Sequence, residues 1–367
     1  AAWAKLSMRY YSCLTPGIQM AGKPKSGSAR ATKKTRRPRL RVALTGANNP
    51  VIARLASRLD QDPNVESVVL FDVIRPVGKL ERARFVNVDL TLPEAPEIVF
   101  DVLKEEKITT FVHGSFLANP ARDPVWAHEL ETIGSMHALD ACAAAKVKHV
   151  ILKSTTMVYG AHHDNPAFLT EEHPLRGNRG SRWVRDKVEA DLQFQRFGTE
   201  HPSTVVTVAR LATVLAPSVT HYVARYLARP VVPVMAGYDP LMQFLDLEDA
   251  ARALRTIIEK RPRGVFNIAP RDVLPLSSVL RIGRRVPIPI SHPLVYSLAG
   301  ILWRGQMVDV PPRFLHYFRY AWNVDAELAQ SELDLSALWT TRDVVTRFYE
   351  GEGKPMNSGD DFKVEAS

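Results

Sequence analysis

Cysteine is scarce in this chain, and no long apolar run occurs in its 367 residues. The two cysteines, Cys13 and Cys142, lie far apart, which argues against a disulfide framework and against a cysteine-rich zinc site. A bilayer span needs about 20 apolar residues, and the longest candidate run, at residues 294–303, is much shorter. We therefore predict a buried helix there, with a place at a membrane interface as the alternative, and a reducing, cytoplasmic location.

Acidic residues are absent from the first 41 positions, which hold eleven of the 48 lysines and arginines. The remaining 37 bases face 39 acids, so the net charge of +9 belongs to this segment and the rest is close to neutral. A charged nucleic-acid-binding face on the folded part is therefore not expected. We predict a disordered basic extension at residues 1–38. Three roles are open for it: contact with an anionic partner, targeting to an organelle as a transit peptide, or solubility alone.

Strand-like and helix-like patterns alternate from residue 39 onward, with apolar runs such as RVALT, VVLF and HVIL between helical segments. Continuous apolar strands separated by helices predict an α/β fold with a doubly wound, Rossmann-like parallel sheet covered on both faces. After about residue 215 the alternation loosens and prolines accumulate. We predict a Rossmann-like domain at 39–215, a smaller C-terminal substrate lobe at 216–350 with a return to the sheet at about 242–268, and a flexible tail at 351–367.

A single glycine marks the turn after the first predicted strand, in TGANNPVI at residues 45–52. A dinucleotide-binding turn normally carries three glycines, and here Asn49 and Ile52 stand at the other two places. Asn49 is a good helix N-cap and Pro50 suits the first helical position, so the helix can still present N–H groups to an anion. We expect Ile52 to push helix and strand apart or to narrow the phosphate cleft. The predicted cofactor contacts of this turn are Gly46, Asn48, Asn49 and Pro50.

Carboxylates end the second and third predicted strands. Asp72 is the last residue of VVLFD, where it is predicted to accept hydrogen bonds from the ribose hydroxyls of an adenosine and to repel a 2′-phosphate. Asp89 closes VNVD and is predicted to accept from the adenine amino group. The alternative for each is a turn residue at a strand end. We predict NAD or NADP as cofactor: Asp72 favours NAD, Arg75 keeps NADP open, and Asn49 and Ile52 put binding itself in doubt.

The run KHVILKSTTMVYG, at residues 148–160, resembles a known family together with TGA, LFD, VHGS, GSMHALDACAAAKVKHV and VFNIAP. The family is the extended short-chain dehydrogenase/reductases, the NAD-dependent epimerase/dehydratase group, and the resemblance covers about residues 39–270. It implies the fold predicted above, an oxidoreductase or epimerase, and a homodimer paired through the helices that hold Met136 and Val188. It adds to the predicted cofactor contacts His113, Gly114 and Arg210.

In that family a Tyr-x-x-x-Lys pair on one helical face carries the chemistry: the lysine holds the nicotinamide ribose and the tyrosine exchanges a proton with the substrate. The resemblance places Lys187 at the lysine position and also at the cofactor, and Thr155 at the position that orients the substrate oxygen. Trp183 stands where the tyrosine is expected, and an indole neither ionises near neutral pH nor accepts a proton. Tyr159 of the VYG motif is the candidate substitute acid.

Glu131 stands where the family has an asparagine that relays protons through the lysine, and a buried glutamate there is expected to pair with Lys187. We therefore predict an atypical family member that binds NAD(P) weakly and acts as a sensor, scaffold or regulator. Two alternatives stay open. One is an active oxidoreductase or epimerase on a sugar nucleotide, sterol-like or lipid substrate, using Thr155, Tyr159 and Lys187. The other is a non-enzymatic adaptor recruited through the basic extension. No metal-binding pattern is found, because Asp246 and its acidic neighbours fit helix caps better.

Overall fold

The structure is a computed structural model that describes residues 39–76, 80–121, 123–178, 180–305, 311–335 and 338–351. The predicted basic extension at 1–38 and nearly all of the predicted tail lie outside the described residues. Within the described part, every helix is too short or too polar to cross a bilayer.

The chain enters the fold through a strand–helix–strand unit. β1 (Leu40–Thr45) pairs in parallel with β2 (Val65–Asp72), and α1 (Pro50–Gln61) connects them. The predicted start of α1 is confirmed: Asn49 is its N-cap, with a side chain that accepts from the backbone N–H of Val51 at 3.1 Å. Asn49 itself is extended, with φ −68° and ψ 127°, so it does not use the left-handed region.

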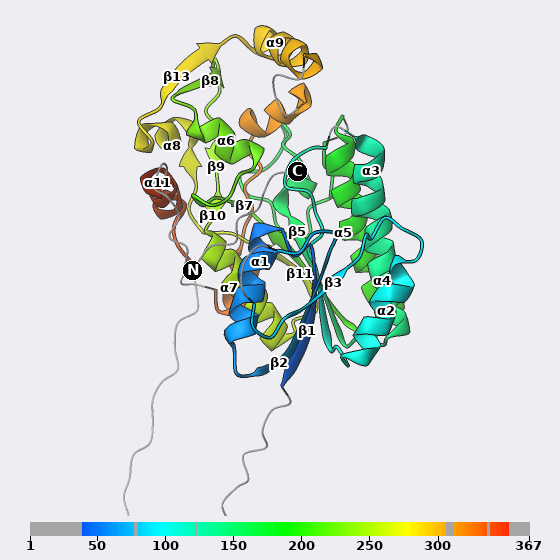
Figure 1. Cartoon of the computed structure of the whole chain (residues 1–367). Coiled ribbons are helices and arrows are strands. Elements are labelled where there is room, and N and C mark those ends of the chain that lie inside the picture. Colours follow the sequence, from blue (N-terminus) through cyan, green and yellow to red (C-terminus); the bar gives the residue numbers. More distant parts are fainter. Residues whose placement is uncertain are drawn as a thin grey trace, which may run out of the picture. The chain divides into compact units, whose positions relative to one another are not determined.

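Seven parallel strands form the central sheet, in the order β11-β6-β5-β4-β1-β2-β3 (Figure 1). The other strands of this sheet are β3 (Arg84–Asn87), β4 (Thr110–His113), β5 (His149–Thr155), β6 (Val205–Leu211) and β11 (Gly264–Ile268). The strand order reverses between β1 and β4, and ligands of doubly wound sheets bind at such a switch point, beyond the carboxyl ends of the strands. The predicted fold class is confirmed.

Helices cover both faces of this sheet (Figure 1). One face carries α1 and α7 (Leu247–Lys260), which pack against each other. The other face carries α2 (Ala95–Glu105), α4 (Gly134–Ala144) and α5 (Arg182–Glu200). Two apolar clusters result, one built around residues such as Leu44 and Leu55, the other around Phe111 and Phe194. Complete burial of each such side chain contributes about 1.5–3 kcal/mol to the free energy of folding. The two clusters therefore fix the strands of the central sheet in place.

Short elements make the connections. They are α3 (Pro124–His128), the π-helical turn η1 (Glu129–Ile133), the 3-10 turns η2 (Thr156–Tyr159) and η3 (Pro312–Phe318), β7 (Thr213–Val214), β9 (Leu241–Met242), β10 (Phe244–Leu245) and β12 (Leu274–Pro275). The later part of the chain adds α6 (Tyr222–Ala228), β8 (Val231–Met235), α8 (Leu276–Ile282), β13 (Val286–Ile290), α9 (His292–Arg304), α10 (Glu327–Leu333) and α11 (Thr341–Gly351).

The helix predicted at residues 294–303 is present as α9, but the prediction that it is buried is wrong. None of its residues is fully buried, and Leu294 and Ile301 are 58% and 65% exposed. The physical reason is its position beside β13 with η3 packed against it, which leaves much of its apolar surface uncovered. Apolar composition alone therefore did not distinguish a core helix from a peripheral one.

Candidate functional site

A cavity of about 410 Å³ lies beyond the carboxyl ends of the strands near the switch point. Its walls come from the turn after β1, the segment after β4, the ends of β5 and β6, and helices α5 and α6. The residues used below that line it are Asn48, Asn49, Pro50, Phe116, Leu117, Lys153, Thr155, Trp183, Lys187, His221 and Tyr222. Its size is in the range of small-molecule sites.

The turn after β1 requires glycine at residue 46. Gly46 has φ +72°, and a Cβ there would lie 2.6 Å from the backbone carbonyl of Gly114. The turn is tied to the end of β2, because the N–H of Asn48 donates to the Asp72 carboxylate at 2.9 Å. The predicted residues Gly46, Asn48 and Asp72 are thus assembled around the start of α1, with Asp72 half-buried. Of these three, Asn48 lines the cavity, and Gly46 and Asp72 lie next to it without lining it.

Ile52 does not line the cavity. Its side chain is fully buried and lies over Gly114, just after β4, where an added Cβ would be 2.3 Å from Ile52 Cγ1. A third glycine on the helix would normally leave room for close packing. Here the glycine that leaves this room is Gly114, which follows β4. Gly114 serves packing here and is not among the cavity-lining residues.

The predicted ion pair between Glu131 and Lys187 is confirmed. Lys187 Nζ lies 2.6 Å from Glu131 Oε1 and also donates to the carbonyl of Leu117 at 3.1 Å, while the Leu117 N–H donates to the same carboxylate oxygen at 2.9 Å. Both charged side chains are buried. Burial lowers the pKa of Lys187 and raises the pKa of Glu131, and their mutual attraction offsets part of each shift. The π-helical turn η1 carries Glu131 to this position, and such turns often occur at functional sites.

Trp183 covers the Lys187 ammonium. Nζ lies 4.3 Å from the centre of the indole and 4.7 Å from the ring of Phe116, which is the arrangement of a cation–π contact. The indole also packs against Phe314, with ring centres 5.2 Å apart, and edge-on against Tyr222. At the position where the resemblance predicts a proton-transferring phenol, an indole therefore covers the lysine.

Tyr159 and Arg210 lie elsewhere. Arg210 donates to both oxygens of Asp191, at 2.7 and 3.0 Å, and to the hydroxyl of Tyr159 at 2.8 Å. The Tyr159 hydroxyl in turn donates to Asn267 at 2.8 Å, and burial raises the pKa of Tyr159. Neither residue lines the cavity. In this structure they support the sheet, and Tyr159 is not placed to act as the substitute acid.

His113 and Asp89 are also bound locally. The His113 ring contacts the Thr45 and Ser135 hydroxyls at 2.9 and 3.1 Å, and burial lowers its pKa to about 3, which keeps it neutral. The Asp89 carboxylate accepts from the N–H and the hydroxyl of Thr91 and so closes a turn, as the alternative for this residue predicts. Neither side chain lines the cavity.

Thr155 and Lys153 face the cavity from β5. The Thr155 hydroxyl accepts from the N–H of Met157 at 3.3 Å, which leaves its own proton available for a substrate oxygen. Sequence reasoning missed Lys153. The sequence signal that could have identified it is a lysine directly after the apolar run VIL, in a strand of a parallel sheet that is covered on both faces and so excludes solvent.

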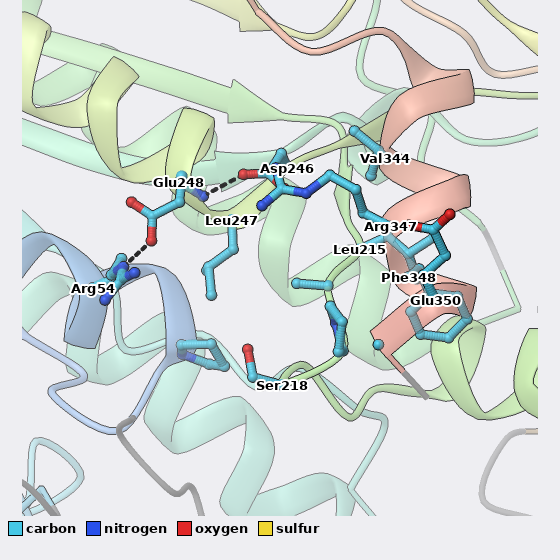
Figure 2. Close-up of a pocket in the computed structure, with 14 residues that line it drawn as sticks. Arg54, Leu215, Ser218, Asp246, Leu247, Glu248, Val344, Arg347, Phe348 and Glu350 are labelled. Carbon is cyan, nitrogen blue, oxygen red and sulfur yellow. Dashed lines mark hydrogen bonds and ion pairs between the residues drawn. The ribbon is translucent and has the colours of Figure 1, made fainter. Parts of the chain in front are cut away.

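Ion-paired side chains line a neighbouring cavity of about 350 Å³ between α1, α7 and α11 (Figure 2). Its Arg54 pairs with Glu248, and its Arg347 lies 3.2 Å from Asp246. Asp246 accepts from the Glu248 N–H at 2.8 Å, so the prediction that this acidic group caps a helix is confirmed. Across the described ranges, no group of His, Cys, Asp or Glu side chains could hold a metal.

The chain is similar in sequence to known proteins. A model of the NAD dependent epimerase/dehydratase family matches residues 42–269. A Mycobacterium tuberculosis protein described as uncharacterized is 29% identical over 319 residues, covering 85% of this chain and 84% of that protein.

Solved structures show the same fold. A UDP-glucose 4-epimerase of Thermus thermophilus in complex with NAD aligns with a TM-score of 0.66 at 17% identity, over 86% of this chain and 99% of that one. A dTDP-glucose 4,6-dehydratase of Bacillus anthracis in complex with NAD aligns with a TM-score of 0.65 at 15% identity, over 86% and 97%. The match of the family model covers more than half of the 367 residues. The chain therefore belongs to the NAD-dependent epimerase/dehydratase family.

Proposed function

We propose that this chain binds NAD in the cavity at the switch point and does not use tyrosine-dependent hydride transfer. Its role is then that of a dinucleotide-responsive protein with, at most, slow tyrosine-independent catalysis. The observation that carries the proposal is the Trp183 indole, 4.3 Å from the Lys187 ammonium, at the place of the family's proton-transferring phenol. Bound NAD supplies a hydride acceptor.

The residues at the switch point fit a dinucleotide. Gly46 leaves the backbone of the turn free of a side chain, and α1 begins beside it, so the positive end of the helix dipole is available to stabilise a pyrophosphate. Asp72 stands at the end of β2, half-buried and with acceptor capacity for ribose hydroxyls. Lys187 is fixed by Glu131 within the same cavity.

Asp72→Ala is expected to weaken NADH binding by about 10- to 100-fold, because hydrogen bonds to a charged acceptor contribute about 1.5–3 kcal/mol. The measurement is a titration of the full chain with NAD, NADH, NADP and NADPH, followed by tryptophan fluorescence, since Trp183 lines the cavity. Asp101→Asn, an exposed carboxylate on α2, is the matched control and should leave the affinity unchanged. Absence of binding by all four dinucleotides at millimolar concentration would contradict the proposal.

Trp183→Tyr is expected to raise the rate of NADH formation with UDP-glucose, a probe taken from the activity of the Thermus neighbour. A positioned general acid or base contributes about 10²–10⁴-fold, but Glu131 neutralises the lysine that has to activate the phenol. We therefore expect a small gain for Trp183→Tyr and, per folded molecule, a gain of at least tenfold more when Glu131→Asn is added. Trp183→Phe is the control without a hydroxyl. Equal rates in all variants would mean that the indole is not what limits the chemistry.

The homodimer through α4 and α5 stays a prediction. These helices pack together, and they expose Met136 and Leu192. The proposed partner is a second copy of the chain.

A further inference from the structure

Lys153 and Thr155 share one face of β5. Alternate residues of a strand point the same way, and both side chains line the cavity together with Lys187 and Trp183. The intervening Ser154 also lines the cavity, but its hydroxyl is taken up by the buried network, where it donates to Asp191 at 2.7 Å. The end of β5 therefore presents an amine and a hydroxyl, two residues apart, to the same ligand.

Lys153 has no hydrogen-bond or ion-pair partner within the described residues, in contrast to Lys187, which is held by Glu131 and Leu117. Burial and the nearby Lys187 ammonium lower the pKa of Lys153 to about 7, although Glu131 acts in the opposite direction. Amine and ammonium are then both populated at neutral pH. An unpaired, half-buried amine in a cavity is free to meet a ligand.

The histidine and tyrosine side chains near Lys153 have hydrogen-bond partners within the protein, and burial keeps them in their neutral form. His221 from the start of α6 contacts the Val214 carbonyl at 2.7 Å and accepts from the Ala224 N–H at 3.2 Å, and burial lowers its pKa to about 4. His113 at the end of β4 is neutral, as described above. Burial raises the pKa of Tyr222 well above its ordinary value, and its hydroxyl points to the sulfur of Met157 at 3.7 Å. Among the lysines that line the cavity in the described part of the chain, Lys153 is the one whose amine has no hydrogen-bond or ion-pair partner, and it shares its face of β5 with Thr155.

We propose that Lys153 is the proton donor and acceptor of this site, with Thr155 holding the substrate oxygen, in place of the absent tyrosine. The ligand class is a secondary alcohol and its ketone. In oxidation the neutral Lys153 amine takes the hydroxyl proton and becomes an ammonium, the C–O bond becomes a carbonyl, and the C–H electron pair leaves as hydride to NAD, giving NADH. In reduction the Lys153 ammonium returns that proton to the oxygen. This inference rests on the proposed function, because it needs NAD in the cavity.

The first test is the pH dependence of dinucleotide affinity, which requires no substrate. The nicotinamide ring of NAD is cationic and that of NADH is neutral, so a Lys153 ammonium opposes NAD more than NADH. For the wild-type chain we expect NAD affinity to rise about tenfold between pH 6 and pH 8, around the pKa of about 7, with NADH affinity nearly constant. Lys153→Met should remove this rise, and Lys153→Arg, which stays charged, should hold NAD affinity low throughout. Lys148→Met, an exposed lysine just before β5, should behave as wild type.

The second test is NADH formation with NAD and UDP-glucose under single-turnover conditions. We expect the wild-type rate to increase with pH through neutrality and Lys153→Met to lower it at least 100-fold while NADH affinity stays within twofold. A wild-type chain that binds neither NAD nor NADH overturns the proposed function. A chain that binds both, but whose NAD affinity is independent of pH or unchanged by Lys153→Met, overturns the placement of Lys153. Equal rates for Lys153→Met and wild type, or no NADH formation by wild type, overturn its proton-transfer role.

Discussion

Glu131→Gln is expected to destabilise the protein by about 3–5 kcal/mol, because loss of one partner leaves the other charge of a buried pair without compensation. Lys187 is only 3% exposed, and its ammonium lies 2.6 Å from the carboxylate. An amide at this place can still accept from the Leu117 N–H, but it carries no charge. The measurement is urea unfolding at neutral pH.

Two controls make this result specific to the buried pair. Glu129→Gln, in the same π-helical turn but half-buried and with a side chain that makes no hydrogen bond or ion pair within the described residues, should change stability by less than about 0.5 kcal/mol. The double change Glu131→Leu with Lys187→Met should recover much of the loss, since an apolar pair can replace a buried ion pair at little cost. A cost below about 1 kcal/mol for Glu131→Gln would show that Lys187 reaches another anion or solvent.

Gly114→Ala is expected to destabilise the protein by about 1–3 kcal/mol, the usual cost of overpacking a core. The added Cβ would lie 2.3 Å from Ile52 Cγ1 and 3.1 Å from the Thr45 carbonyl oxygen, so α1 would have to move relative to the turn that we propose binds the pyrophosphate. We also expect weaker NADH binding, measured by the fluorescence titration. Unfolding in urea measures the change in the free energy of unfolding.

The contact itself is tested by a double-mutant cycle. Ile52→Ala alone should cost about 2–5 kcal/mol through the cavity that it leaves. With Gly114→Ala added, the total should be smaller than the sum by about 1–3 kcal/mol, because the two side chains then share the space. Strict additivity would show that Gly114 does not compensate for Ile52.

The parts of this protein that could be predicted are those that depend on local sequence patterns. The alternation of apolar strands and helices gave the parallel sheet, and the residue types at Asn49 and Pro50 gave the start of α1, because both depend on neighbours in the chain. The pair between Glu131 and Lys187 could be predicted only through resemblance to a family, because the two residues are 56 positions apart.

Contacts between distant segments were the parts that could not be predicted. Nothing near Ile52 in the sequence indicates that Gly114, just after the distant strand β4, provides the space for it. Tyr159 and Arg210 match family positions, yet their side chains meet Asn267 and Asp191 in a buried network. Lys153 stands out only once the sheet is assembled, when a lysine inside a buried strand is seen to face a cavity.

The central claim is that a dinucleotide fits this cavity while an indole shields the lysine. A crystal structure of the full chain with NAD tests it most directly. The account predicts the pyrophosphate at the start of α1 beside Gly46, the adenosine ribose on the Asp72 carboxylate, and the nicotinamide between Thr155, Lys153 and the Trp183–Lys187 pair. An empty cavity at millimolar NAD, or a tyrosine hydroxyl in contact with Lys187 and the nicotinamide, would contradict it.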